Sequence, residues 1–118
     1  MELNEYQKQA MTTCMPSCDN FSYMALNLMG EVGEFMGKVA KHIRKGEAFI
    51  DDGVLYFKRN MPVEVVEALQ DEGGDMLWQL MGLFAVMGWD ANAIAQRNLA
   101  KLRDRAMRNV IIGEGDNR

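Results

Sequence analysis

Residues 21–46 read FSYMALNLMGEVGEFMGKVAKHIRKG. Apolar side chains recur along this stretch every three or four positions, which is the spacing of one face of an α-helix. They are Met24, Leu28, Val32, Phe35, Met36, Val39 and Ile43. The stretch closes on several cations and Gly46, which suit the negative end of a helix dipole and a helix stop, respectively. The pattern predicts one long helix that begins after Asn20 and ends before Gly46.

Three further helices are indicated on either side of this stretch. They run from about Leu3 to Thr13, from near Asn60-Met61-Pro62 to Gly88, and from Asp90 through Ala106. We expect Asn4 and Gln7 to cap the first of them and Asp90 to cap the last. Residues 47–60 are expected to be extended or to form a loop. The polar, glycine-rich tail, at about residues 111–118, is expected to be flexible.

Composition places limits on the function. The chain has 118 residues, 17 Asp and Glu against 13 Lys and Arg, and a formal net charge of −4. We interpret residues 1–118 as a single domain, which at this length can bury a core without disulfides or a structural metal. The excess of acids argues against nucleic-acid polymers as partners, and no apolar run approaches the ~18 to 20 residues of a membrane span. We therefore expect a cytoplasmic protein that binds no nucleic-acid polymer and no membrane.

Two pairs of carboxylates lie at matched positions on the two long helices. Glu31 and Glu34 form one pair, and Glu72 and Asp75 form the other. Each pair is spaced i,i+3, which puts its two side chains on one helix face, one turn apart. Each pair also lies about 12 residues, or about 18 Å, from the segment that connects the helices. If the helices run antiparallel, all four carboxylates come to the same height.

Four converging carboxylates point to metal chemistry. They would repel one another unless cations compensate, and ligands that offer only oxygen select Mg²⁺ or Mn²⁺. Without these four acids, the remaining acids equal the Lys and Arg residues in number. Either Glu34 or Glu72 could accept a proton from an attacking water. The opposing interpretation is that these acids merely solvate a helix face.

Glycines flank both acidic pairs. They are Gly30, Gly33, Gly37, Gly73 and Gly74. Each glycine inside a helix costs about 1 kcal/mol relative to alanine, so their accumulation needs a compensating role. A close approach of two backbones, or room for a ligand beside the carboxylates, would supply one.

Other residues are candidates for substrate binding. Lys38 lies four residues after Glu34 and is either a surface ion-pair partner or a phosphate ligand. Asn98, Lys101 and Arg105 form one polar stripe on the last helix, which could hold a phosphate or a base edge or could be solvated surface. Trp78 could stack on a base or fill the core. If the stripe is solvated surface, the residue that binds the substrate phosphates is expected to be Lys38, Lys41 or Arg118.

These motifs resemble a known family. The pairs Glu31-x-x-Glu34 and Glu72-x-x-Asp75, the run Asp75-Met76-Leu77-Trp78 and the run Asn98-Leu99-Ala100-Lys101-Leu102 look like those of the MazG-like, all-α nucleoside triphosphate pyrophosphohydrolases. The resemblance covers residues 3–118, including the closing Ile112–Arg118. At Gly73 the family usually has a larger apolar residue, which predicts a reshaped metal site.

The resemblance implies a fold and an activity. The fold would be an all-α, four-helix antiparallel bundle with a core shared between the subunits of a homodimer or homotetramer. The activity would be hydrolysis of a nucleoside or deoxynucleoside triphosphate between the α and β phosphates, giving a nucleoside monophosphate and pyrophosphate. Mg²⁺, or Mn²⁺ in its place, would be held at Glu31, Glu34, Glu72 and Asp75, and Asn98 and Lys101 would contact phosphate or sugar. The alternatives are a narrower activity on modified nucleotides and a non-enzymatic helical oligomerisation or regulatory module.

Overall fold

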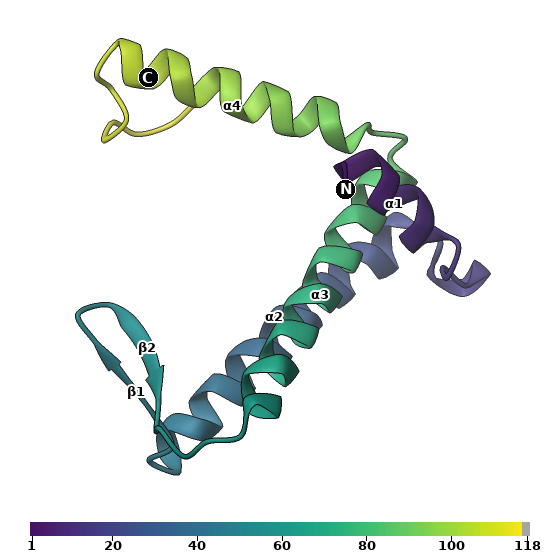
Figure 1. Ribbon diagram of the computed structural model, residues 1–118. Helices are drawn as coiled ribbons and strands as arrows, with labels where there is room; N and C mark the ends of the chain where they lie inside the picture. The colour runs from purple at the N-terminus through teal and green to yellow at the C-terminus, as the bar shows by residue number, and fades with distance from the viewer. Residues whose placement is uncertain (117–118) are drawn as a thin grey trace.

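Over residues 1–116, which the structure describes, the chain folds into four α-helices and a two-stranded sheet (Figure 1). In this computed structural model the elements follow the order α1 (Leu3–Met11), the 3-10 helix η1 (Pro16–Cys18), α2 (Phe21–Arg44), β1 (Ala48–Asp51), β2 (Val54–Phe57), α3 (Val63–Val86) and α4 (Ala91–Met107). The predicted all-α class with four helices is confirmed.

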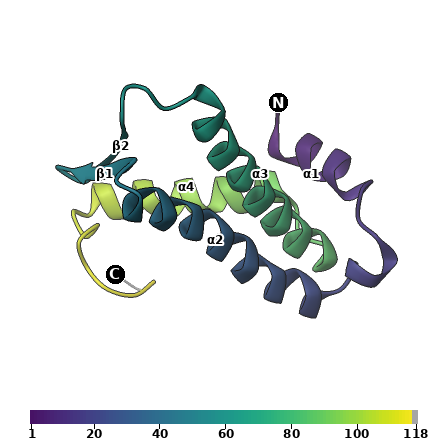
Figure 2. The same cartoon turned by 90° about the horizontal axis from the view of Figure 1, so that it is seen from below.

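Helices α2 and α3 lie side by side and antiparallel, and they form the main body of the molecule (Figures 1 and 2). The Asn20 side chain caps α2 by accepting a hydrogen bond from the Tyr23 N–H at 2.8 Å. Gly46 ends this helix with a φ of +69°, and Gly88 follows α3 with a φ of +70°. Pro62 stands at the start of α3, where a missing N–H costs nothing. Local sequence signals therefore set both helices to equal lengths of 24 residues.

The core between α2 and α3 is small. Met24 is fully buried, and its Sδ atom lies so close to Gly82 that a Cβ at that glycine would come within 2.6 Å. The other buried apolar residues within 1–116 are Val39, Leu69 and Met81 on these two helices, Ala48 on β1 and Ala91 on α4. Most of the remaining large apolar side chains are partly or largely exposed.

Helix α1 packs across α3 and the beginning of α4. Gln7 donates a hydrogen bond to the carbonyl of Met81 at 3.1 Å, and the Asn92 N–H donates to Asn4 Oδ1 at 2.9 Å. The prediction that Asn4 and Gln7 cap α1 is therefore wrong. Glu2 occupies the N-cap position without a side-chain hydrogen bond, because the two amide side chains are engaged in these tertiary contacts.

The segment left open as extended or loop is a β-hairpin. Strands β1 and β2 pair antiparallel from Ala48 opposite Phe57 to Asp51 opposite Val54. Asp52 and Gly53 connect them, with φ of +48° and +75°, as the two central positions of a tight hairpin turn require. On an exposed part of the hairpin, the rings of Phe49 and Tyr56 stack with centroids 5.6 Å apart.

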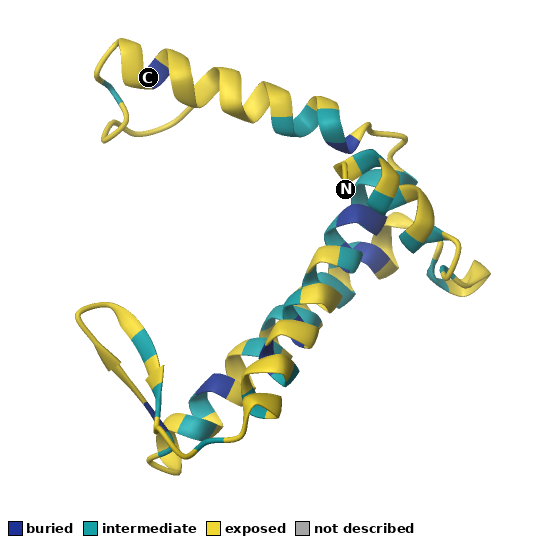
Figure 3. Ribbon diagram, viewed as in Figure 1, coloured by how far each residue is buried: buried dark blue, intermediate teal, exposed yellow. Residues whose placement is uncertain are grey.

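Helix α4 departs from the other helices. The Asp90 side chain caps it by accepting from the Ala93 N–H at 2.8 Å. The helix then runs away from α2 and α3, and most of its surface is exposed (Figure 3). The radius of gyration is 17.8 Å, whereas a compact domain of this length would have about 13 to 14 Å. The chain thus has an open, angular shape.

The described part of the predicted flexible tail, residues 111–116, returns to α4. Asp116 accepts hydrogen bonds from Arg105 at 2.9 Å and from Lys101 at 3.2 Å. These two cations hold the pKa of the Asp116 carboxyl below its ordinary value, the Arg105 hydrogen bond being the larger cause. Arg118, a predicted phosphate-binding candidate, lies outside the described residues.

Candidate metal centre

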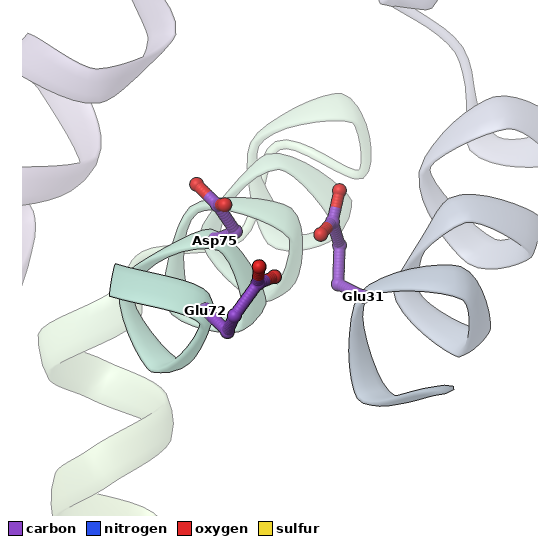
Figure 4. Close-up of side chains that lie close together, drawn as sticks. All are labelled: Glu31, Glu72 and Asp75. Carbon is purple, nitrogen blue, oxygen red and sulfur yellow. The ribbon is translucent and has the colours of Figure 1, made fainter. Parts of the chain in front are cut away.

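Three of the four predicted ligands meet between α2 and α3. One carboxylate oxygen from each of Glu31, Glu72 and Asp75 lies within 4.8 Å of the others. Glu31 projects from α2, while Glu72 and Asp75 project from successive turns of α3 toward the same side (Figure 4). The equal distances from the connecting segment thus bring the two acidic pairs to one level, because the helices are antiparallel.

The electrostatics of this cluster suit a cation. The pKa of the Glu31 carboxyl is raised, first by burial and then by the charges of Glu34 and Asp75. Glu72 is only 9% exposed, and its Oε2 atom is buried without a hydrogen-bond partner. A buried carboxylate oxygen without a partner carries a desolvation cost that a metal ion would remove. The donor set of oxygens alone fits a hard divalent ion such as Mg²⁺.

An amide relay positions Glu31. Asn27 donates through its Nδ2 atom to Glu31 Oε1 at 3.1 Å and to Gln79 Oε1 at 2.9 Å. Gln79 is 1% exposed and in turn donates to the carbonyl of Met24 at 3.3 Å. Sequence reasoning missed both amides, although Asn27 precedes Glu31 by four residues, a spacing that places both on one helix face.

Lys38 and Glu34 have different surroundings. Lys38 forms an ion pair with Oε1 of Glu72, so this lysine reaches the cluster from the next turns of α2. Hydrogen bonding to Glu72 raises the pKa of Lys38, which keeps it protonated. Glu34 lies outside the group of three carboxylates and forms no hydrogen bond or ion pair with the described residues, yet its charge acts on both Glu31 and Lys38. Glu34 therefore lies at the open edge of the cluster.

The helical glycines do not mark a close approach of backbones within the chain. A Cβ added at Gly33, Gly37, Gly73 or Gly74 would meet nothing within 4 Å, and one at Gly30 would meet only the Asn27 side chain at 3.4 Å. The close contact between α2 and α3 occurs instead at Gly82, which sequence reasoning did not single out. Of the two uses predicted for these glycines, room for a ligand beside the carboxylates is the one that the structure leaves open.

The predicted residues of α4 lie apart from the acidic cluster of their own chain. Asn98 and Lys101 line an open hollow of about 480 Å³ along α4, and Arg105 is buried under the tail. This helix diverges from the α2–α3 pair (Figure 1). Trp78 lies on α3, and its indole N–H donates to the carbonyl of Ala10 at 3.1 Å and to Thr13 at 3.0 Å. Trp78 thus anchors α1 to α3.

Comparison with known proteins identifies related sequences. The profile of the MazG nucleotide pyrophosphohydrolase domain matches residues 20–109, which include both acidic pairs and the whole of α4. The Gene 37 protein of Mycobacterium phage L5 is 34% identical over 125 aligned positions that cover the whole of both chains. No solved structure matches the chain. Within residues 1–116, no helix has both the length and the apolar character needed to cross a membrane.

Proposed function

Because the chain belongs to the MazG nucleotide pyrophosphohydrolase family, we propose that it hydrolyses a nucleoside or deoxynucleoside triphosphate between the α and β phosphates. The products are a nucleoside monophosphate and pyrophosphate, and the reaction depends on Mg²⁺, for which Mn²⁺ can substitute. The observation that carries this proposal is the convergence of Glu31, Glu72 and Asp75, with one buried Glu72 oxygen that has no hydrogen-bond partner among residues 1–116.

The residues divide into ligands and a proton acceptor. Glu31, Glu72 and Asp75 would hold the ion, which when bound neutralises phosphate charge and makes water more acidic. Lys38 holds one oxygen of Glu72 and leaves the other free to face the ion. Glu34 is the better candidate for general base, because it lies beside the cluster without an ion-pair partner among the described residues. It would take the proton of the water that attacks the α phosphorus.

We further propose that the chain works as a homodimer, or as a homotetramer built from such dimers. Its accessible surface is 8662 Å², whereas a compact monomer of 13.4 kDa would expose about 6500 Å². The difference of about 2000 Å² per chain is the area that an obligate dimer interface covers. Exposed apolar residues on α2 and α4, among them Leu26, Met29, Met36, Leu99 and Leu102, support the same conclusion.

Self-association would also complete the site. Asn98, Lys101 and Arg105 are the predicted phosphate and sugar contacts, and α4 carries them away from the acids of its own chain. In a symmetric dimer, α4 of one chain can lie across the α2–α3 pair of the other, closing a four-helix bundle whose core both chains share. The substrate would then contact both chains.

The direct test is to incubate the protein with each common triphosphate and measure monophosphate and pyrophosphate, with Mg²⁺, with Mn²⁺ and with a chelator. We expect release of pyrophosphate that stops in the chelator. Release of orthophosphate instead would contradict cleavage between the α and β phosphates. If neither ion raises the melting temperature and no triphosphate is cleaved, the chain is a non-enzymatic module.

A further inference from the structure

One face of α2 changes from acidic to basic along its length. Glu31, Glu34, Lys38, Lys41 and Lys45 follow one another at intervals of three, four, three and four residues. This spacing keeps successive side chains on one stripe of the helix. The acidic half of the stripe belongs to the carboxylate cluster. The basic half, with Lys41 and Lys45, continues beyond the candidate metal centre toward the end of the helix.

The basic half borders a cavity of about 550 Å³ between the end of α2 and the start of α3. Lys38, Lys41, His42 and Lys45 line one side of it, and Met61, Val65, Ala68 and Leu69 are the main apolar lining. Lys41 and Lys45 form no ion pair or hydrogen bond through their side chains with the described residues. Two lysines without an ion-pair partner among the described residues, Lys41 and Lys45, thus share one hollow with Lys38, which pairs with Glu72.

Two acids also line the cavity, so its lining carries three lysines against two glutamates. Glu47 lies beside His42, with 3.5 Å between its Oε1 atom and His42 Nδ1, and Glu64 is exposed in the first turn of α3. No side chain caps the N-terminus of α3 at Pro62. The first N–H groups of that helix therefore add positive potential at the rim of the cavity.

Lys38 connects the cavity to the candidate metal centre, because it lines the cavity and forms an ion pair with Glu72. We propose that this cavity binds the pyrophosphate end of the triphosphate, with Lys41 and Lys45 as its main contacts. This inference rests on the proposed function, in which the α phosphorus lies at the carboxylates. From there, the β and γ phosphates extend along the same stripe of α2 onto the lysines.

The test is direct binding of inorganic pyrophosphate to the full chain in the presence of Mg²⁺, measured by titration calorimetry. We expect the double variant Lys41→Gln/Lys45→Gln to bind pyrophosphate at least about tenfold more weakly, because two charge-assisted contacts are lost. The charge-retaining Lys41→Arg/Lys45→Arg should stay within about threefold of the wild type. Lys8→Gln, which removes an exposed cation from α1, is the matched control and should have no effect. Circular dichroism checks that each variant is folded.

The outcomes separate this site from the proposed function. Equal affinity in the wild type and the double glutamine variant, or no binding of pyrophosphate by the wild type, would overturn the inference even if triphosphates are hydrolysed. Loss of pyrophosphate binding only in the glutamine variant would support it even if no triphosphate is cleaved. Weakening in the arginine variant equal to that in the glutamine variant would also count against it, because the charge would then be irrelevant.

Discussion

The α2–α3 pair and helix α4 have similar helical sequence patterns, but they differ in how far their own chain covers them and supplies partners for their polar residues. In the pair, polar residues have partners in the same chain: Gln79, Asn27 and Glu31 form a hydrogen-bonded relay, and Lys38 pairs with Glu72. In α4 only Ala91 and Arg105 are buried. The pair is thus organised by its own chain, whereas most of α4 is exposed and its cations Lys101 and Arg105 donate to Asp116 in the tail. This difference supports the proposal that α4 acts on something other than its own α2–α3 pair.

The strongest effect is expected within the pair. Asp75→Asn should lower turnover about 1000-fold, because the charge stabilisation contributed by a bound ion is worth several kcal/mol. Asp75 is exposed, so the fold should survive. Glu34→Gln should lower turnover as well but keep the rise in melting temperature on adding Mg²⁺, which Asp75→Asn should lose. Near-normal turnover in Asp75→Asn would refute the carboxylate site.

Helix α4 should contribute less, but measurably. Lys101→Ala should lower kcat/KM by about 10- to 150-fold, the value of a charge-assisted hydrogen bond to phosphate. Lys8→Ala, which removes an exposed cation on α1, should cost less than about threefold. Steady-state kinetics on the same triphosphate compare the two. Equal, small losses would make the polar face of α4 an ordinary solvated surface.

Mixing the two kinds of variant tests whether the pair and α4 of different chains cooperate. Asp75→Asn chains and Lys101→Ala chains, unfolded and refolded together in equal amounts, should regain about a quarter of wild-type activity, because half of the random dimers carry one intact site. Each variant refolded alone should stay inactive or nearly so. Activity that does not exceed the average of the two separate samples would mean that each α4 serves its own chain.

Two glycines of α3 should respond in opposite directions. Gly82→Ala places a methyl group against the buried Met24 and should lower the free energy of unfolding by about 1 to 2 kcal/mol. Gly73→Ala meets nothing within 4 Å and should raise it by up to about 1 kcal/mol through helix propensity. Denaturant unfolding of the metal-free protein measures both. A destabilised Gly73→Ala would show that this position has a neighbour in the assembled protein.

The smallest expected effect is a dependence of stability on pH. Burial and the nearby charges of Glu34 and Asp75 raise the pKa of Glu31, so the folded chain binds this proton more tightly than the unfolded chain does. That contribution is complete below the unfolded pKa of about 4 and is lost as the pH rises through the folded value. Melting temperatures of the metal-free protein should therefore fall over that range. Glu31→Gln should flatten this dependence of melting temperature on pH, and saturating Mg²⁺ should counteract the fall. An unchanged dependence in Glu31→Gln would mean that another group causes it.

Sequence reasoning succeeded where the decisive contacts are local. The helix start after Asn20, the cap at Asp90, the stop at Gly46 and the i,i+3 spacing of the acids each depend on a few neighbouring residues. The meeting of the acidic pairs followed because two helices of equal length are joined at one end. Asp52-Gly53 also carries a hairpin signal, but the prediction for residues 47–60 names only an extended segment or a loop.

The failures concern partners that are distant in the sequence. Asn4 and Gln7 fit a capping pattern, yet their partners, Asn92 and Met81, are more than 70 residues away. Gly82 has no local feature to distinguish it from the other helical glycines, since only the buried Met24 gives it a role. The direction of α4 could not be predicted either, because the apolar face of a helix does not identify the chain that covers it.

In the proposed dimer, the divergence of α4 would make the activity depend on the amount of protein. A centre whose acids and phosphate contacts come from different chains exists only in the associated form. Its population follows mass action, so at concentrations below the dissociation constant the yield of active centres rises with the square of the chain concentration. Dilution would then lower the activity per chain. A rise in the amount of protein would raise the total activity more than in proportion to the number of chains.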